Sequence, residues 1–374
     1  MLDVVVPLVR EPLRLLFVGT LAEPGGAASH FISLTTAMAS AGHRISVVAA
    51  PGSGIWHALE GNRRITLYGA AFTRTFESSA MRVIKQAVHD LRPDRVIGVF
   101  ERDYWGTAVV AAQCKVPLDL FLHHAGMKRS NKIVLPWLRR RFLLPSENLQ
   151  RWLISLGVNA RRTRVLYNPI DTNVFRPNAA LREATRAELG LKHDDVLVGY
   201  VGRLESNKGI VPFAQSVTRA MAAVPNMHAM WVGFGRREKE LDEIIQTSPF
   251  AARHIRRPWA DDMLAYYSAM DMLALPSTGR EAFGRVLVEA QSCGIPVLGS
   301  SIGGIAEAMK VGVTGYLVEP GDVNAWASAL IKLAQDPAQR ARMGLAGRAF
   351  VQSEFDSTVI AAAFEQLLRP ASPH

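Results

Sequence analysis

The stretch REAFGRVLVEAQSCGIPVLGS, residues 280–300, carries two acids eight positions apart, Glu281 and Glu289. A helix is predicted to begin near Gly284, so that Glu281 lies in the loop before the helix and Glu289 lies more than one turn inside it. The apolar run at 296–300 predicts a buried strand directly afterwards. A loop, a helix and a buried strand in succession are typical of an α/β protein with a parallel sheet.

The spacing of the two acids also indicates a ligand site. Eight residues along a helix rise about 12 Å, so two acids at this spacing can contact two parts of one extended ligand. Carboxylates accept hydrogen bonds from hydroxyl groups, which ribose and hexoses supply. Backbone N–H groups at Phe283, Gly284 and Arg285 would face the same ligand at the helix N-terminus. The alternative interpretation is one helix-capping acid and one solvated acid.

Apolar runs that predict buried strands recur along the chain and alternate with helical stretches. They lie at 13–19, 44–50, 94–100, 119–124, 196–202, 227–233, 272–276 and 296–300. The stretch NPIDTNVFRP at 168–177 interrupts this alternation with two prolines and several turn-forming residues. We therefore predict two doubly wound, Rossmann-like parallel sheets, in domains 1–172 and 173–350. Ligands of such sheets bind beyond the carboxyl ends of the strands, so two facing sheets would form an interdomain cleft.

Two further loops could hold phosphate. GTLAEPGGAASH at 19–30 places Gly25 and Gly26 at the predicted start of a helix, although it is not the G-x-G-x-x-G dinucleotide fingerprint. GRLESNKG at 202–209 places Arg203 and Lys208 in a loop after a predicted strand, and this pair of cations suits a diphosphate. The alternatives are an ordinary loop-to-helix turn and two solvated surface cations.

The composition is that of an ordinary globular protein with a basic balance. The 374 residues carry a formal net charge of +10, which suits an anionic partner such as nucleic acid, a phosphorylated ligand or an acidic membrane surface. The same charge is equally compatible with a basic protein that has no such partner. The two cysteines give no disulfide framework, and no apolar run approaches the roughly 20 residues of a membrane span. The start of the chain lacks the features of a signal peptide, so we expect a cytoplasmic protein.

Taken together, the motifs resemble those of the GT-B retaining glycosyltransferases of family 4, the glycosyl transferases group 1. These motifs occur along the chain in the same order as in the family. They are the glycine pair, NPID, GRLESNKG, LPSTGREAFGRVLVEAQSCGIPV, and GGIAEAM with GVTGYLVEPGD after it. The two acids at 281 and 289 are the most specific of these elements. The resemblance implies a GT-B fold, and we expect a C-terminal helix, 351–374, that packs back toward the N-terminal domain. The chain has EAFG where family members often carry EGFG, and we expect this small change to leave activity intact.

The resemblance also implies a reaction, in which a sugar moves from a nucleoside diphosphate to an acceptor hydroxyl with retention of its anomeric configuration. Arg203 and Lys208 would stabilise the charge that develops on the leaving diphosphate. A phosphate oxygen would take the acceptor proton, so no protein nucleophile is required. The implied catalytic residues are Glu281, Arg203, Lys208 and His123, and the implied donor-binding residues are Gly25, Gly26, Phe283, Gly284, Arg285 and Glu289. His124 is adjacent to His123, and the sequence leaves open which of them lies beside the donor sugar.

No cofactor is expected apart from the donor, for which a UDP-sugar is the first expectation and a GDP- or ADP-sugar the alternative. The sequence has no D-x-D triplet and no His/Cys/Asp cluster with metal-ligand spacing, so we expect no metal site. Glu307 has two interpretations, as a residue near the site or as a helix cap. Ser146 is predicted to cap the helix that follows it.

The segment 127–145 mixes six cations with large apolar side chains. Such a mixture suits the interface of an anionic membrane, and the family binds acceptors in its N-terminal half. We therefore expect a saccharide or lipid-linked acceptor of the cell envelope, such as lipopolysaccharide, and peripheral contact with the cytoplasmic face of the inner membrane. The alternative is a basic helix that packs on its own domain.

Other classes of protein fit the sequence less well. A sugar-nucleotide epimerase or a phosphorylase would keep the two-domain fold, but epimerases lack this arrangement of acids and cations. A nucleic-acid-binding protein is suggested only by the net charge, and no recognition motif supports it, so we expect no nucleic-acid partner. A dehydrogenase is disfavoured because the dinucleotide fingerprint is missing.

Overall fold

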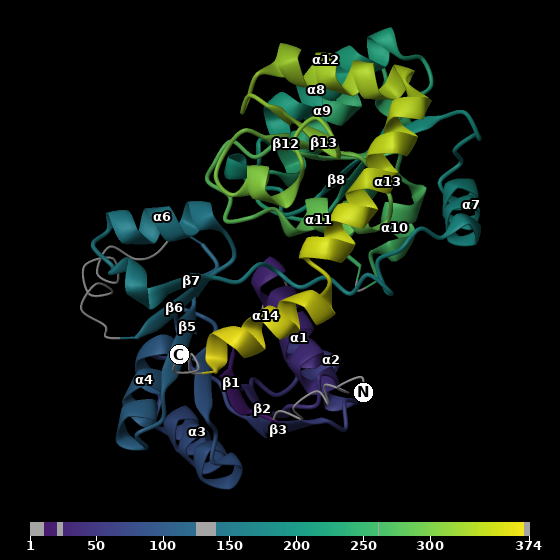
Figure 1. Ribbon diagram of the computed structural model, residues 1–374. Coiled ribbons are helices and arrows are strands. Elements are labelled where there is room, and N and C mark those ends of the chain that lie inside the picture. Colours follow the sequence, from purple (N-terminus) through teal and green to yellow (C-terminus); the bar gives the residue numbers. More distant parts are fainter. Residues whose placement is uncertain (1–10, 21–24, 125–139, 261, 370–374) are drawn as a thin grey trace, which may run out of the picture.

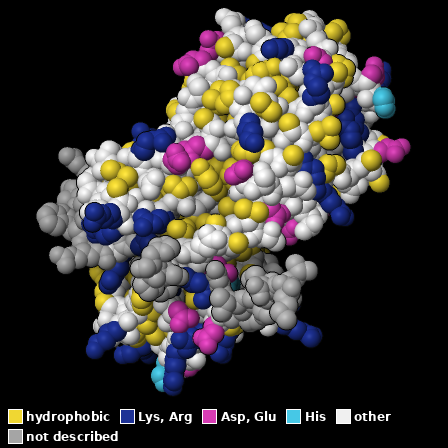
Figure 2. Space-filling model, viewed as in Figure 1, with side chains coloured by type: hydrophobic (Ala, Val, Ile, Leu, Met, Phe, Trp, Pro, Cys, Tyr) yellow, Lys and Arg dark blue, Asp and Glu magenta, His cyan; other side chains and the backbone are white. Residues whose placement is uncertain are grey.

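The computed structural model describes residues 11–20, 25–124, 140–260 and 262–369. The chain forms two lobes, each built on one parallel sheet with helices on both faces (Figure 1). Within these residues no helix is both long enough and apolar enough to cross a membrane. On the face shown in Figure 2, Lys and Arg side chains are spread over both lobes.

The first domain has a seven-stranded parallel sheet with the order β3-β2-β1-β4-β5-β6-β7. The strands are β1 (Arg14–Val18), β2 (Arg44–Ala49), β3 (Ile65–Gly69), β4 (Arg95–Gly98), β5 (Leu118–Phe121), β6 (Arg141–Leu144) and β7 (Thr163–Val165). Helices α1 (Gly26–Ser40), α2 (Gly54–Glu60) and α14 (Ser357–Leu368) cover one face, and α3 (Ser78–Leu91), α4 (Tyr104–Gln113) and α6 (Glu147–Ser155) cover the other. The strand order reverses between β1 and β4, which is where doubly wound sheets bind ligands.

The second domain repeats this plan with a six-stranded parallel sheet in the order β10-β9-β8-β11-β12-β13. Its strands are β8 (Val196–Val201), β9 (Met227–Val232), β10 (His254–Arg257), β11 (Met272–Leu275), β12 (Val297–Ser300) and β13 (Gly315–Val318). Its α-helices are α7 (Ala179–Glu188), α8 (Ile210–Ala223), α9 (Glu238–Thr247), α10 (Leu264–Ala269), α11 (Arg285–Ser292), α12 (Val323–Gln335) and α13 (Pro337–Glu354). Short 3-10 helices include η3 (Ser206–Lys208) and η5 (Ile305–Ala308), which both lie in loops beyond strands. The expected fold class is confirmed.

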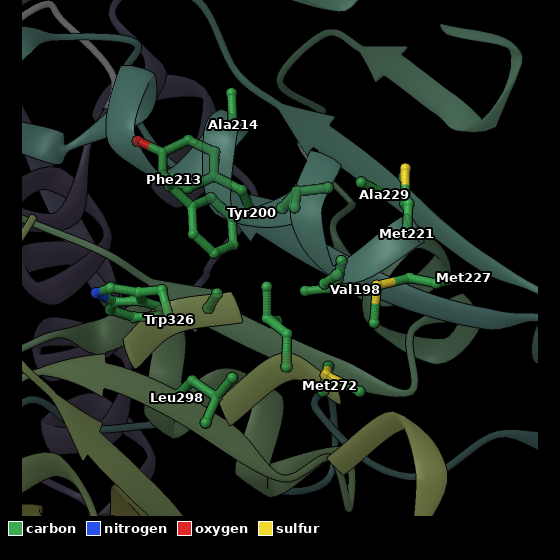
Figure 3. Close-up of a cluster of buried hydrophobic side chains, with 14 of the residues drawn as sticks. Val198, Tyr200, Phe213, Ala214, Met221, Met227, Ala229, Met272, Leu298 and Trp326 are labelled. Carbon is green, nitrogen blue, oxygen red and sulfur yellow. The ribbon is translucent and has the colours of Figure 1, made fainter. Parts of the chain in front are cut away.

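The core on one face of the second sheet is built around aromatic side chains from β8, α8, β9 and α12. Figure 3 shows three of them, Tyr200 of β8, Phe213 of α8 and Trp326 of α12. The ring of Phe213 meets Trp231 and Trp326 edge to face, with centroid distances of 5.5 and 5.3 Å. Each indole N–H has an acceptor, His254 Nδ1 for Trp231 and the Glu319 carbonyl for Trp326. Large apolar area is thus buried without leaving the polar indole atoms unpaired.

The chain passes between the domains twice, and the two crossings pair with each other. Ile170 donates its N–H to the Phe355 carbonyl at 2.8 Å, and its own carbonyl accepts from Ser357 N–H at 2.9 Å. Beyond this point α14 lies on the first domain, beside α1 (Figure 1). It buries Ile360 and Phe364 in the same cluster as the β1 and α1 side chains.

The part of the basic segment that the structure describes differs from the expectation of a membrane-facing surface. Residues 127–139 lie outside the described residues, but Phe142, Leu143 and Leu144 form β6 and are fully buried. Arg141 faces the fully buried Asp119 across β5 and β6 and donates two hydrogen bonds to its carboxylate, at 2.8 and 2.6 Å. Residues 141–144 are therefore a sheet strand, and at least one of the cations neutralises a buried acid instead of facing a membrane.

Candidate active site

Two loops of the second domain clasp each other beyond the ends of the neighbouring strands β8 and β11. The carbonyl of Asn207 accepts hydrogen bonds from Thr278 N–H at 3.0 Å and Gly279 N–H at 2.8 Å. Gly209 has a left-handed φ of 67°, and a Cβ there would lie 2.0 Å from the Pro276 carbonyl oxygen. Only glycine allows this approach, and it brings the 202–209 loop against the loop that carries Glu281.

Within this clasp, Lys208 and Glu281 form an ion pair. The Lys208 Nζ donates to Glu281 Oε1, and the Ser277 hydroxyl donates to the same oxygen at 2.7 Å. The Lys208 and Glu281 side chains are 17% and 15% exposed, so the pair is mostly buried but retains some contact with solvent. Because an ammonium group has three N–H donors, Lys208 can bind a second anionic group without leaving Glu281. Ser277 was not predicted, although its place directly after a strand could have indicated it.

Helix α11 begins at the predicted place. Gly284 is its N-cap, with φ 105°, and no side chain caps the helix or places an acid in its first turn. Among the described residues, none accepts a hydrogen bond from the backbone N–H of Phe283, Gly284 or Arg285. Free N–H groups and the positive end of the helix dipole together suit an anionic ligand. The Phe283 side chain itself is buried in the core, so a contact with the donor would come from its backbone.

Glu289 lies in a different environment from Glu281. Its carboxylate accepts hydrogen bonds from the Tyr267 hydroxyl at 2.6 Å and from Arg285 Nε at 2.7 Å, and the residue is 7% exposed. The Arg285 guanidinium also donates to the Pro169 carbonyl at 3.0 Å and to the Ser33 hydroxyl of α1 at 3.2 Å. Arg285 therefore links the acid-bearing helix to the first domain. The expected contact between Glu289 and a ribose stays a prediction.

In the first domain, His123 follows β5 and its ring stacks on Phe121 at 5.4 Å. Burial lowers the pKa of His123 to about 3, so its imidazole is neutral at pH 7. His30 was not predicted as a site residue, but its ring meets that of His123 edge to face at a centroid distance of 4.8 Å, and its Nδ1 lies 2.7 Å from Asn168 Oδ1. Nε2 of both histidines is buried without a hydrogen-bond partner among the described residues. The adjacent His124 is exposed, and the choice between His123 and His124 stays a prediction.

The glycine pair stands at the start of α1, where a Cβ on Gly25 or Gly26 would meet no described atom within 4 Å. Thr20, which lies shortly after β1, is held by Asp103, which accepts hydrogen bonds from the Thr20 N–H and hydroxyl, both at 2.8 Å. Burial raises the pKa of Asp103 to about 6. This buried acid was also missed, because its partner is distant in the sequence.

The remaining predicted residues can be placed as follows. The Arg203 side chain is exposed and makes no ion pair or hydrogen bond with a residue that the structure describes, whereas the Arg203 backbone carbonyl accepts a hydrogen bond from the Tyr200 hydroxyl at 2.8 Å. The structure thus brings Lys208 and Glu281 together, and it groups Glu289 and Arg285 with the first domain's α1. Among residues 11–20, 25–124, 140–260 and 262–369, no group of three His, Cys, Asp or Glu side chains could hold a metal ion.

The chain has two facing Rossmann-like domains, and acids, cations and free helix amides lie in the loops beyond their strands. This combination defines the GT-B class. The family described as Glycosyl transferases group 1 matches residues 182–350, and Glycosyltransferase Family 4 matches residues 24–174. The two matches together span most of the chain, and the chain belongs to this family of glycosyltransferases.

Several known proteins are similar to this chain. D-inositol 3-phosphate glycosyltransferase of Mycobacterium bovis is 32% identical over 229 residues, which are 58% of this chain and 46% of that protein. The chain thus spans about half the length of the curated relatives it matches. The structure of Anabaena HepE in complex with UDP and glucose has a TM-score of 0.84 at 24% identity, covering 95% of this chain and 99% of that one. A glycosyltransferase from Rickettsia africae has a TM-score of 0.83 at 15% identity, covering 96% and 98%.

Proposed function

We propose that the chain is a retaining glycosyltransferase that moves a sugar from a nucleoside-diphosphate sugar to an acceptor hydroxyl. The observation that carries the proposal is the Lys208–Glu281 pair beside the free N-terminal amides of α11. A cation and helix amides suit a diphosphate, and a carboxylate suits the hydroxyls of a sugar. The donor would therefore bind mainly to the second domain, at the carboxyl ends of β8 and β11.

The largest change of charge in this reaction occurs on the leaving diphosphate. When the bond between the anomeric carbon and the phosphate oxygen breaks, the electron pair stays on the diphosphate and its negative charge grows. Lys208, Arg203 and the α11 amides would stabilise that charge more strongly in the transition state than in the bound donor. The acceptor hydroxyl attacks from the face that the diphosphate leaves, and its proton passes to a phosphate oxygen.

The other predicted residues would orient the donor. Glu281 would accept hydrogen bonds from the transferred sugar, and Glu289 would accept them from the ribose. His123 is neutral at pH 7, so it would contact the sugar as a hydrogen-bonding group and not as a cation. Because these residues belong to both domains, the donor would be enclosed when the domains close over it.

The donor nucleotide and the acceptor follow as further parts of the proposal. UDP-sugars are the first donors to test, followed by GDP- and ADP-sugars. For the acceptor we propose a saccharide or a lipid-linked saccharide of the cell envelope, reached at the cytoplasmic face of the membrane. The supporting observation is the net charge of +10, which favours an anionic surface. Co-sedimentation with anionic but not with neutral liposomes is expected, and equal binding to both would contradict the membrane contact.

A thermal-shift screen against UDP-, GDP- and ADP-sugars tests the donor class. We expect one nucleotide series to raise the melting temperature, and the matched free nucleoside diphosphate to appear when donor and acceptor are incubated together. NMR of the product should show the anomeric configuration of the donor. If no sugar nucleotide raises the melting temperature, or if the configuration is inverted, the proposal is contradicted.

A further inference from the structure

Glu307 of the second domain caps a helix of the first domain. It lies on η5, and its carboxylate oxygens accept hydrogen bonds from the backbone N–H groups of Glu147 at 2.7 Å and Asn148 at 2.8 Å. These are the first two residues of α6, whose N-cap Ser146 accepts from Leu149 N–H at 3.1 Å as predicted. The first N–H groups of a helix have no partner inside the helix, and a negative charge is favoured beside them. Both domains therefore contribute to one helix cap.

The turn before η5, close to Glu307, also contacts the loop that carries Glu281. Gly304 donates its N–H to the Glu281 carbonyl at 2.9 Å. A Cβ on Gly304 would lie 2.2 Å from the Ala282 carbonyl oxygen and 2.9 Å from the Ser146 hydroxyl. The turn before η5 is therefore pressed between the Glu281 loop on one side and the start of α6 on the other. A shift of α6 relative to the second domain would move this turn, and the turn is bonded directly to Glu281.

Tyr167, in the first crossing between the domains, supports the arrangement from a third side. Its hydroxyl donates to Glu307 Oε2 at 3.2 Å, and its ring lies 5.6 Å from that of Phe283. Burial and the nearby Glu307 carboxylate raise the pKa of Tyr167 to about 12, so the phenol keeps its proton at neutral pH. Tyr167 thus connects the chain crossing to Glu307, which caps α6, and to Phe283, which lies between Glu281 and Glu289.

We propose that Glu307 is a positioning residue for the transfer reaction: by docking on α6, it holds the Glu281 loop in the geometry that the donor sugar requires. The inference rests on the proposed function and extends it to a residue that does not touch the Lys208–Glu281 pair. It makes the geometry of the donor site depend on contact between the domains. Loss of the cap should therefore impair the chemical step more than donor binding.

The test compares Glu307→Ala and Glu307→Gln with the wild-type chain and with Glu183→Gln. Glu183 is an exposed acid of the same domain, so its variant controls for the lost charge. For Glu307→Ala we expect amide hydrogen exchange in the peptide at the start of α6 to rise roughly tenfold, and kcat to fall roughly tenfold, with the donor KM changed less than about threefold. Glu307→Gln keeps one acceptor oxygen and should lie between the wild type and Glu307→Ala in both measurements.

Each result supports or overturns the positioning role. Faster exchange at α6 with kcat unchanged would show that the cap is only structural, and unchanged exchange would show that the cap does not form in solution. Equal kcat for Glu307→Gln and Glu307→Ala would also contradict the proposal. A wild-type chain that binds no sugar nucleotide would overturn the proposed function itself, while the exchange rates would still show whether Glu307 caps α6.

Discussion

Lys208 and Glu281 are 73 residues apart in the sequence and form an ion pair beyond the ends of two adjacent strands. Each residue comes from a loop that the other loop holds in place, through the hydrogen bonds to Asn207 and the close approach at Gly209. The pair is therefore fixed by backbone geometry and not by the attraction of two flexible side chains alone. This pre-positioning is what a site needs if it is to stabilise charge without reorganising during the reaction.

Replacing Lys208 by alanine should lower kcat by about 10²–10³ with acceptor and donor at saturation, because the leaving diphosphate loses its fixed cation. Stability should also fall, by about 1–3 kcal/mol, because the pair is mostly buried and Glu281 loses its cation while keeping the Ser277 hydroxyl. Steady-state kinetics and urea unfolding measure the two effects. The matched control is Lys239→Ala, which removes an exposed cation from α9 of the same domain. Similar rates for both variants would remove Lys208 from the site.

Gly209→Ala should destabilise the second domain and weaken donor binding, because the new Cβ would collide with the Pro276 carbonyl. Gly190→Ala is a matched control: Gly190 has φ 71°, close to the 67° of Gly209, but a Cβ there would meet nothing within 4 Å. Left-handed strain alone should cost about 1 kcal/mol in the control. Urea unfolding should show at least twice that loss for Gly209→Ala, and equal losses would mean that the two loops do not clasp.

Arg285→Met tests the buried link between Glu289 and the first domain. Both side chains of this pair are about one-tenth exposed, so removing the cation leaves a buried carboxylate whose remaining hydrogen-bond partner among the described residues is Tyr267. Breaking such a pair should cost about 3 kcal/mol of unfolding free energy. Adding Glu289→Leu removes the stranded charge and should recover part of that loss. A double variant less stable than Arg285→Met would contradict this interpretation of the pair.

Asp103 should make stability depend on pH in the direction opposite to that of most carboxylates. Burial raises its folded-state pKa to about 6 from a reference value of 3.8, so the folded protein binds the proton more tightly than the unfolded chain. Its contribution is fully present below about pH 4 and is lost as the pH rises through 6. The unfolding free energy of the wild type relative to Asp103→Asn should fall by about 2 kcal/mol between pH 4 and pH 7. Urea unfolding at several pH values measures it, and a constant difference would contradict it.

Much of the fold could be predicted because the inner strands are continuous apolar runs. All eight of the predicted strands are present, including β8 and β12, which are buried along their whole length. The strands that were missed are less apolar or lie toward the sheet edges. β10, for example, has the sequence HIRR, and in the edge strand β3 only Ile65 is buried. β6 was not predicted because it lies in the basic segment, where Arg141 was interpreted as a surface cation. Arg141 instead neutralises Asp119, and this pairing follows only from the register of β5 and β6.

The residues of the candidate site could be predicted only where they lie close together in the sequence, within one motif. The helix that begins at Gly284 and the loop position of Glu281 follow from local sequence, and both are present. The partners that cross between the domains could not be predicted. Glu307 meets Asn148 across 159 residues and Arg285 meets Ser33 across 252, so no local pattern joins them. His30 was missed for the same reason, since its neighbours His123 and Asn168 come from other elements.

The most direct test is a crystal structure of the chain with the nucleoside diphosphate that binds it most tightly in the thermal-shift screen. We predict that the diphosphate lies within hydrogen-bonding distance of the Lys208 ammonium group and of the amides at the start of α11, in front of Glu281. A nucleotide bound elsewhere, out of contact with Lys208 and these amides, would contradict this placement of the donor site.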